Sequence, residues 1–440
     1  MPTVIELLCK TGTMLGMKPT AHRTETHGIV VDSIAAPHRS LRIACVTETY
    51  PPEVNGVATT MARFVEGLHR RNHDVQLIRP RQATSQAAEQ QPGFHEVLMR
   101  GLPIPKYPNL RMGVPSKRAL VKLWSTHRPD VVHIATEGPL GWSALQAALH
   151  LKLPVCSDFR TNFHAYSKHY GVGWLHRPIM AYLRKFHNRT QATMVPTEAL
   201  RRDLETAGFR HVTVVKRGVD TERFHPGFRN EELRRSWGVA PDDLVVGCVG
   251  RLAAEKNLAT LSAAFEAIRR FDPRAKLVLV GEGPLRAELQ ARWPDAVFAG
   301  QQVGNALSEH YASLDLFLFP SLTETFGNVT PEAMASGLPV VAFNYAAASL
   351  VIQHGHSGVL VTMGDNSAYV RDAVGIAADR ARRAVMGQAA REAALRLNWD
   401  GVIARFETVL LQVIQDADAP PVQDTSRRST PAHPLATSAD

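Results

Sequence analysis

The sequence predicts an α/β protein built from two doubly wound, Rossmann-like domains that face each other across a cleft. Short apolar runs alternate with helical patterns along most of the chain, which is typical of parallel sheets covered by helices on both faces. The alternation occurs in two complete series, and 440 residues are enough for two domains of ordinary size. Ligands of such sheets bind beyond the carboxyl ends of the strands, so two facing sheets create one cleft.

The first series starts with a buried-type strand that ends at a Pro-Pro turn. Its predicted strands lie at residues 41–52, 74–80, 96–100, 130–135, 154–159, 192–197 and 212–218. Its predicted helices lie at residues 57–70 and 116–128, in a stretch ending near residue 150, and from residue 198 onward. The Pro-rich residues 101–115 are predicted to form an irregular surface loop.

The second series repeats the pattern. Its predicted strands lie at residues 244–250, 276–281, 296–300, 315–320, 339–343 and 358–361, and its predicted helices at residues 257–270, 284–292, 306–313, 331–336 and 366–378. A last apolar-periodic helix at residues 399–415 is followed by no strand. The remaining residues are rich in Pro, Ser, Thr and Ala, which predicts disorder.

Composition describes a soluble globular protein, with 45% hydrophobic and 21% charged residues and no apolar run long enough to span a bilayer. The N-terminal 38 residues lack the basic and apolar regions of a secretory signal. Four widely spaced cysteines, Cys9, Cys45, Cys156 and Cys248, favour a reducing cytosol over a disulfide framework or a zinc site. A net charge of +9 permits an anionic partner, such as nucleotide phosphates, anionic lipid or nucleic acid.

The stretch LTETFGNVTPEAMA, residues 322–335, carries two carboxylates at a strand-to-helix junction. Glu324 and Glu332 lie eight residues apart, with a turn at Gly327 between them. We expect the helix to open with Thr330 as its N-cap and Pro331 at its first position. Carboxylates accept hydrogen bonds from hydroxyls, and a helix N-terminus attracts phosphate, so the stretch suggests a nucleotide-sugar pocket. The alternative is a first-turn acid and an ordinary loop carboxylate.

Two cations follow the first strand of the second series, in GRLAAEKN at residues 250–257. Arg251 and Lys256 stand close to a helix start and could neutralise a diphosphate leaving group without a metal. The chain has one D-x-D, at residues 416–418 beside the predicted disordered tail, where no Mg²⁺ or Mn²⁺ site can be built. The alternative interpretation of the cations is a solvated charged turn.

Asn55 and Gly56 form a tight turn between the first strand and the first helix, an arrangement that brings backbone N–H groups close to a phosphate. The same turn is also a common punctuation between elements. A second glycine-rich turn, GEGPLR at residues 281–286, lacks the third glycine of a dinucleotide fingerprint. An NAD-dependent oxidoreductase is therefore the least favoured enzyme class.

The segment from Ser157 to Thr190 interleaves basic and aromatic residues, and no acid occurs between Asp158 and Glu198. His164 stands just past a strand end, where its side chain could point into the cleft. The segment could bind RNA, but no nucleic-acid module accompanies it. Contact with an anionic membrane surface fits better, and a solvated helix face is the remaining alternative.

These motifs together resemble the retaining glycosyltransferases of family 4, which have the GT-B fold. The resemblance rests on GRLAAEKN, GEGPL, FPSLTETFGNVTPEAMASGLPVVA and KRGVDTERF in the second half, and on TETYPPEVNGVATT, VVHIATEGPLGW and RTNFHAYSKHYG in the first. It covers about residues 41–415 and looks closest to the GDP-mannose-dependent α-mannosyltransferase and glycolipid-synthesising branch.

The resemblance implies a role for each site residue. Glu332 would hold the nucleotide ribose, and Arg251 and Lys256 would bind the diphosphate and stabilise the departing nucleoside diphosphate. The donor sugar would be held by Glu324, by His164 and by the backbone at Phe326, Gly327 and Asn328. The Asn55–Gly56 turn would approach both the sugar and the diphosphate. No metal or other cofactor is expected.

The resemblance assigns roles to the two domains and the last helix, and the sequence pattern itself predicts the two terminal segments. Residues 39–215 would form the acceptor-side domain and residues 216–397 the nucleotide-sugar domain. Residues 398–416 would form a helix that packs back on the first domain. Residues 1–38 would be a poorly patterned extension and residues 417–440 a disordered tail.

The predicted function is transfer of a hexose, mannose from GDP-mannose in the first instance, to a lipid or glycan hydroxyl. A UDP-hexose- or UDP-glucuronate-dependent glycolipid synthase, a GT-B nucleotide-sugar epimerase and a non-catalytic sugar-nucleotide-binding scaffold remain alternatives. The expected location is the cytoplasm, peripherally on the inner face of the cell membrane, with no nucleic-acid partner.

Overall fold

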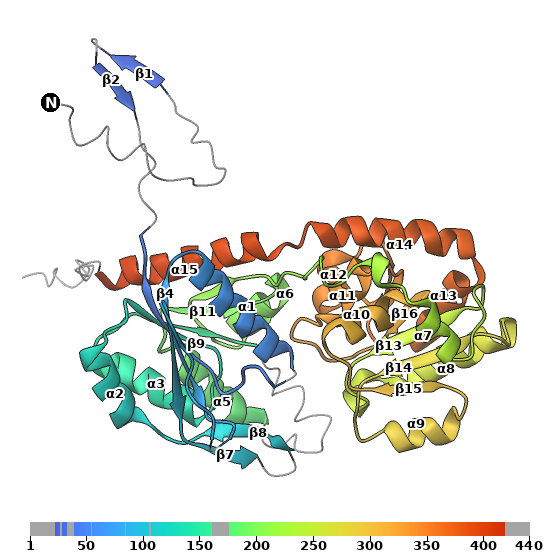
Figure 1. The fold of residues 1–440 in the computed structure, drawn as a ribbon, viewed down its shortest axis with the longest axis horizontal. Coiled ribbons are helices and arrows are strands. Elements are labelled where there is room, and N and C mark those ends of the chain that lie inside the picture. The colour runs from blue at the N-terminus through green and yellow to red at the C-terminus, as the bar shows by residue number, and fades with distance from the viewer. Residues whose placement is uncertain are drawn as a thin grey trace, which may run out of the picture. The chain divides into compact units, whose positions relative to one another are not determined.

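The computed structural model describes residues 23–26, 29–32, 39–53, 55–83, 85–104, 107–160 and 176–418. Contacts divide the chain into one unit of Met1–Ser40 and another of Leu41–Asp440. The first unit contains an antiparallel pair, β1 (Arg23–Thr26) and β2 (Ile29–Asp32). The second unit carries every other described element (Figure 1).

The first sheet of the larger unit has the strand order β12-β11-β10-β9-β3-β4-β6-β5. Its strands are β3 (Arg42–Val46), β4 (Asp74–Pro80), β5 (Gln90–Gln91), β6 (Phe94–Met99), β9 (Val131–Ile134), β10 (Val155–Asp158), β11 (Ala192–Val195) and β12 (Val212–Val214). All pairs are parallel except β5 with β6. The chain builds outward in opposite directions from β3 and β9, so a topological switch point lies between them.

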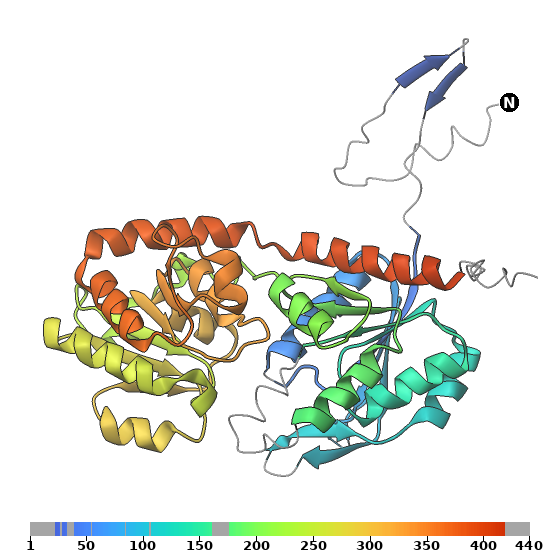
Figure 2. The same ribbon diagram turned by 180° about the vertical axis from the view of Figure 1, so that it is seen from behind.

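Helices cover both faces of this sheet (Figures 1 and 2). They are α1 (Gly56–Arg70), α2 (Lys117–Thr126), α3 (Pro139–His150), α5 (His176–His187) and α6 (Glu198–Thr206). One buried apolar cluster joins α1 to one face of the strands, with Phe64 among its members, and another joins α2 and α3 to the other face, with Trp124 among its members.

The second sheet is parallel throughout and has the order β15-β14-β13-β16-β17-β18. Its strands are β13 (Val245–Val249), β14 (Lys276–Val280), β15 (Val297–Gly300), β16 (Leu316–Phe319), β17 (Val340–Phe343) and β18 (Val359–Val361). The helices that accompany it are α7 (Glu231–Ser236), α8 (Leu258–Phe271), α9 (Arg286–Arg292), α10 (Gly304–Ala312), α11 (Val329–Ala335), α12 (Ala346–Val351), α13 (Asn366–Ala378) and α14 (Arg380–Leu395).

Two α/β series with parallel sheets are confirmed, while one local prediction is wrong here and several helices were not predicted, among them α5, α7, α12 and α14. Within the Pro-rich residues 101–115, predicted to be an irregular loop, β7 (Gly101–Ile104) and β8 (Tyr107–Gly113) form an antiparallel pair. A proline such as Pro103 is tolerated there because each strand of this two-stranded ribbon has a partner on one side alone. Helix α14 was not predicted, although Asp379 caps it by accepting a hydrogen bond from the Arg382 N–H at 2.9 Å.

The final helix, α15 (Trp399–Asp418), packs against the first half of the chain. The ring of Phe406 stacks on that of Phe64 in α1, with 4.2 Å between the centroids. Ile403 fills the space beside Gly67, where a Cβ atom would lie 2.6 Å from the isoleucine. A close approach of the two helices therefore depends on glycine in α1.

A buried carboxylate fixes the same helix by hydrogen bonds. Glu407 accepts from Arg71 Nε at 2.8 Å and from His73 Nε2 at 2.9 Å. Because His73 Nδ1 accepts the Leu41 N–H at 3.1 Å, the ring proton lies on Nε2 and is donated to Glu407. The network satisfies the charge of a glutamate that is 3% exposed.

We expect Phe406→Ala to lower the free energy of unfolding by about 3–5 kcal/mol, because it removes a fully buried ring and leaves a cavity between α15 and α1. Calorimetric unfolding measures the change. The control is Phe271→Ala, which truncates a ring that is 61% exposed and should shift the transition little. Equal transitions for the two variants would contradict the packing role of α15.

Candidate functional site

The carboxyl ends of β13 and β16 bring together residues that are far apart in the sequence. These strands are neighbours, with Val246 opposite Leu316 in parallel register. The chain builds outward from them toward β15 on one side and β18 on the other, so the switch point of the second sheet lies between them. Arg251 and Lys256 follow β13, and Glu324 follows β16. A switch point is where open α/β sheets bind ligands.

Lys256 and Glu324 form an ion pair across this switch point. The lysine Nζ donates to Oε1 of Glu324, and Ser321 Oγ donates to the same oxygen at 2.8 Å. Both charged side chains are mostly buried, with exposures of 13% and 16%. Such a pair keeps each charge compensated in a site from which water is largely excluded.

Arg251 lies in the same loop but is more exposed. Its Nη1 is 4.0 Å from Oε1 of Glu255, and 37% of its side chain is accessible. Glu255 itself is fully buried, and its carbonyl accepts the N–H of Leu322 at 3.2 Å. This backbone bond ties the loop after β13 to the loop after β16, which holds the two sets of site residues in one place.

The glycine-rich turn after β14 serves the packing of these loops. Gly281 has φ +138°, which L side chains rarely adopt, and a Cβ there would lie 2.0 Å from the carbonyl oxygen of Gly250. A Cβ at Gly283 would lie 2.3 Å from the carbonyl oxygen of Leu252. The GEGPLR turn therefore carries its glycines for close backbone contact with the Arg251 loop.

Glu332 stands in the first turn of α11, where it accepts a hydrogen bond from the Tyr311 hydroxyl at 2.9 Å. Burial raises the pKa of Glu332 to about 7, against the opposing effects of that hydrogen bond and of the Arg223 charge. Burial and the carboxylate together raise the pKa of Tyr311 well above its ordinary value. This carboxyl is thus poised between its neutral and charged forms near neutral pH.

The predicted start of α11 is wrong by two residues. Asn328 is the N-cap and Val329 the first helical residue, so Thr330 and Pro331 occupy the second and third positions. Thr330 is 1% exposed and packs into the interior. Pro331 is tolerated because an N–H in the first turn would have no partner within the helix. The preceding Gly327 has φ +89°, a left-handed conformation that only glycine adopts without strain.

The turn after β3 reaches the same place from the first half of the chain. Asn55 caps α1 by accepting from the N–H groups of Val57 at 3.1 Å and Ala58 at 2.9 Å. A Cβ on Gly56 would lie 3.4 Å from Nδ2 of Asn328. The structure therefore brings the Asn55–Gly56 turn to the loop that carries Phe326, Gly327 and Asn328.

Arg217 is a site residue that the sequence-based prediction missed. Its Nη1 donates to Oδ1 of Asn328 at 3.1 Å, and its guanidinium lies over the ring of Phe326, 5.5 Å from the centroid. Burial, followed by the charge of Arg160, lowers the pKa of Arg217 to about 9. The residue stands in KRGVDTERF, a motif used for the resemblance, so a signal was present in the sequence.

The other predicted site features are placed as follows. His164 lies outside the described residues. The described ends of the basic segment are in the core, where the Ser157 and Thr190 hydroxyl oxygens are 3.0 Å apart. Within the described ranges, no three His, Cys, Asp or Glu side chains gather as a metal site would require, and no helix is both long and apolar enough to cross a bilayer.

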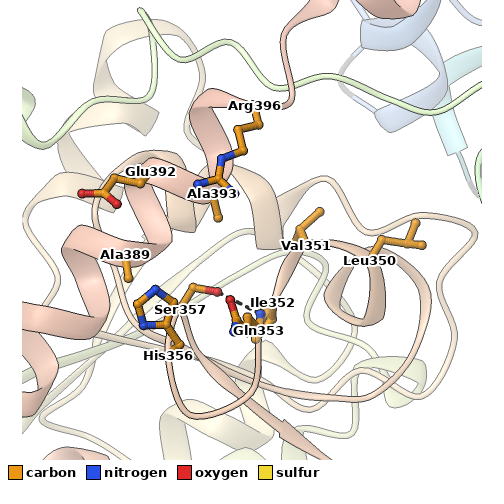
Figure 3. Close-up of a pocket in the computed structure, with 10 residues that line it drawn as sticks. All are labelled: Leu350, Val351, Ile352, Gln353, His356, Ser357, Ala389, Glu392, Ala393 and Arg396. Atoms are coloured by element: carbon orange, nitrogen blue, oxygen red, sulfur yellow. Dashed lines mark hydrogen bonds between the residues drawn. The ribbon is translucent and has the colours of Figure 1, made fainter.

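A separate depression lies away from these residues. Figure 3 shows its lining, contributed by α12, the loop that follows it and α14: Leu350, Val351, Ile352, Gln353, His356, Ser357, Ala389, Glu392, Ala393 and Arg396. A smaller pocket includes Glu324, Phe326 and Tyr345 in its lining. Of the two carboxylates predicted in residues 322–335, Glu324 therefore lines the smaller pocket.

Comparison with known proteins agrees with this arrangement. Two family models match the chain, Glycosyltransferase Family 4 over residues 54–223 and Glycosyl transferases group 1 over residues 243–379. A GDP-mannose-dependent alpha-mannosyltransferase of Mycobacterium tuberculosis is 36% identical over 381 residues, which are 84% of this chain and 97% of that protein. An alpha-monoglucosyldiacylglycerol synthase of Streptococcus pneumoniae is 26% identical over 315 residues, 69% of this chain and 71% of that protein.

Solved structures show the same fold. A sucrose-phosphate synthase from Thermosynechococcus elongatus superposes with a TM-score of 0.68 at 18% identity, over 85% of this chain and 99% of that one. Such neighbours are GT-B glycosyltransferases, so the predicted GT-B fold is confirmed.

The raised pKa of Glu332 predicts a pH-dependent penalty. The folded chain holds a proton on this carboxyl that the unfolded chain releases from about pH 4.5, so stability falls as pH rises toward 7 and the penalty then stays constant at about 3 kcal/mol. Glu332→Gln lacks the titrating group. Its melting temperature relative to wild type should rise from pH 5 to 7 and level off above 7.

Melting curves of both proteins between pH 5 and 8 test this. Glu288→Gln, which removes an exposed carboxyl from α9, controls for the loss of a charge. A difference between Glu332→Gln and wild type that does not change with pH would show that burial does not perturb Glu332.

Proposed function

The chain belongs to glycosyltransferase family 4 and is a hexosyltransferase that uses a nucleotide-sugar donor, and on this premise we propose that it transfers mannose from GDP-mannose to a hydroxyl of a lipid or glycan. One structural observation carries the proposal: Lys256 and Glu324 meet at the switch point of the second sheet, beside Arg251. The GDP-mannose dependence named for the 36% identical relative supports the choice of donor.

Each charged group has a proposed task. Ionised Glu332 accepts hydrogen bonds from the ribose, and Glu324 accepts them from hydroxyls of the donor sugar. Arg251 and Lys256 bind the diphosphate, and their positive charge stabilises the departing GDP as negative charge develops on it. The backbone of Phe326, Gly327 and Asn328 and the Asn55–Gly56 turn complete the donor site. These cations make a metal ion unnecessary in the proposal.

We propose that the reaction retains the anomeric configuration by a front-face displacement. The acceptor oxygen forms its bond to the anomeric carbon on the side from which GDP leaves. The bond from that carbon to the phosphate oxygen breaks, and the leaving phosphate oxygen takes the acceptor proton. His164 would support the positive charge that develops on the sugar. A covalent sugar adduct on Glu324 would contradict this mechanism.

A UDP-dependent glycolipid synthase is the second candidate. The diacylglycerol-glycosylating relative from Streptococcus pneumoniae favours a lipid acceptor and leaves a glucose donor in consideration. Glu324 and Glu332 can accept hydrogen bonds from the hydroxyls of any hexose and of any ribose. They therefore do not distinguish a guanine nucleotide from a uracil nucleotide.

Peripheral contact with an anionic membrane on the inner face of the cell membrane forms part of the proposal. Helix α5 buries Leu183 and Phe186 and exposes Arg177, Arg184 and Lys185. Leu102 and Met112 of the β7–β8 hairpin are also exposed, at 49% and 39%. Basic residues beside exposed apolar ones suit an anionic lipid surface.

A panel of GDP- and UDP-sugars tests the donor by thermal shift. GDP-mannose at about 100 times its Kd should stabilise the protein by roughly 2.7 kcal/mol, because it binds the folded state alone. UDP-glucose, UDP-galactose and UDP-glucuronate should produce no comparable shift. A shift with UDP-sugars alone would select the second candidate.

Turnover of labelled GDP-mannose with and without membranes extends the same test. Label that moves into the lipid fraction only when membranes are present supports a transferase. A changed sugar nucleotide formed without acceptor would identify an epimerase, and binding without any turnover would identify a scaffold.

Membrane contact predicts a charge-dependent affinity for vesicles. Replacing Arg177, Arg184 and Lys185 together by Gln should weaken binding to phosphatidylserine vesicles about 100-fold, at about 1 kcal/mol for each cation. Sedimentation with vesicles at low and high salt measures it. Replacing Arg270, Arg274 and Arg371 of the second half, which are also exposed, controls for net charge and should have little effect.

A further inference from the structure

Arg217 is a buried cation without its full set of hydrogen-bond partners. The residue follows β12 in the segment that joins the two sheets and is 4% exposed. Nη1 is used by Asn328, whereas Nε and Nη2 are buried and have no hydrogen-bond partner. Buried polar groups are rarely left unpaired, and unpaired buried charges cost several kcal/mol. An arrangement of this kind points to a ligand.

A second buried arginine, Arg234, shows how a structural guanidinium is paired with a carboxylate in this chain. Its Nε also has no hydrogen-bond partner, but it lies 3.7 Å from Oε2 of Glu231. Arg234 is 1% exposed. It donates through Nη1 to Oδ2 of Asp315 at 3.0 Å and through Nη2 to the carbonyl of Asp243 at 2.8 Å. Within the described part of the chain, Arg217 has no carboxylate at ion-pair distance.

The acids around Arg217, Asp158 and Glu324, compensate its charge only in part, because burial and Arg160 still lower its pKa. Arg160 is near enough to lower its pKa, and Nη1 of Arg160 is also buried without a partner. Asp158, the nearby acid on β10, is already used by Arg160 Nε at 2.5 Å and by His133 at 3.0 Å. Glu324 is paired with Lys256. The nearby Asp158 carboxylate thus pairs with Arg160 and His133, and the charge of Arg217 has no ion-pair partner within the described residues.

The guanidinium group of Arg217 lies beside the start of α1. A Cβ on Gly56 would lie 3.7 Å from Nη1 of Arg217. Helix α1 has 15 residues and no acidic side chain in its first turn. The neutral Asn55 side chain caps the Val57 and Ala58 N–H groups, so no negative charge offsets the positive dipole end there. The helix dipole and the two guanidinium groups add their positive potential at one point.

We propose that Arg217 binds an oxyanion of a substrate through Nε and Nη2, at a subsite completed by the N-terminus of α1 and by Arg160. Planar guanidinium N–H pairs match the geometry of phosphate and carboxylate oxygens. Nη1 stays on Asn328, so binding of the anion also fixes the loop that holds the donor sugar. The subsite rests on the proposed function and extends it by a residue outside the Arg251 loop.

Two substrates could supply the oxyanion, the diphosphate of the donor or an anionic group of the acceptor. Calorimetric titration of wild type, Arg217→Gln and Arg217→Lys separates them. If the donor supplies it, Arg217→Gln should bind GDP 10- to 100-fold more weakly and leave the affinity for guanosine unchanged. Arg217→Lys keeps the charge without the fork and should give an intermediate Kd.

With GDP saturating, inorganic phosphate and methyl β-glucuronide serve as probes of an acceptor anion. If the acceptor supplies the oxyanion, wild type binds one of these probes, Arg217→Gln does not, and the Kd for GDP is equal in both. Arg234→Gln is the matched control, because it removes a buried guanidinium that pairs with Asp315 before the amino end of β16, whereas Glu324 follows the carboxyl end. It should lower the melting temperature without changing any Kd.

Unchanged affinities of Arg217→Lys for GDP, phosphate and methyl β-glucuronide would overturn the proposal. This variant keeps the buried charge, so the test can still be made if Arg217→Gln does not fold. Failure of the proposed function would give a different result in the same titrations. Wild type would then bind no GDP, while any Arg217-dependent binding of phosphate or methyl β-glucuronide would still support the subsite.

Discussion

The ion pair between Lys256 and Glu324 joins loops that stand 68 residues apart in the chain, and the site depends on it. The pair can form because β13 and β16 are neighbours in the second sheet, which places the loops after both strands at one edge. Neither charge could be mostly buried alone, since removing a single charge from water is costly. The backbone bond from Leu322 to Glu255 and the glycine contacts after β14 hold the two loops at the separation that the pair needs.

The buried ionisable groups of the site are in three different electrostatic situations. Lys256 and Glu324 neutralise each other, whereas burial raises the pKa of Glu332 to about 7 against the opposing effect of the Tyr311 hydrogen bond. Arg217 keeps its charge with two nitrogens unpartnered. A donor that presents hydroxyls and phosphates could satisfy all three, because each group then exchanges an internal compromise for a hydrogen bond with substrate.

The last helix of the chain, far from the site in sequence, ties the second half of the chain to the first. Helix α15 returns to the first half, where Phe406 stacks on Phe64 and Glu407 bonds to Arg71 and His73. The same α1 begins at the Asn55–Gly56 turn beside Asn328. Because α15 packs along α1, it supports the position of the Asn55–Gly56 turn and so contributes to the geometry of the donor site.

The sequence by itself determined the two α/β series, the family resemblance and most of the charged candidates, because apolar periodicity and local motifs are properties of short segments. Local pattern was insufficient in two places. The high proline content of residues 101–115 predicted a loop where β7 pairs with β8, and the start of α11 was predicted two residues after Val329. Only the tertiary structure decided that Lys256 meets Glu324, that Glu332 meets Tyr311, and that Arg217 is buried with unpaired nitrogens. Strand order, burial and hydrogen-bond satisfaction arise from contacts between distant segments, and no local pattern encodes them.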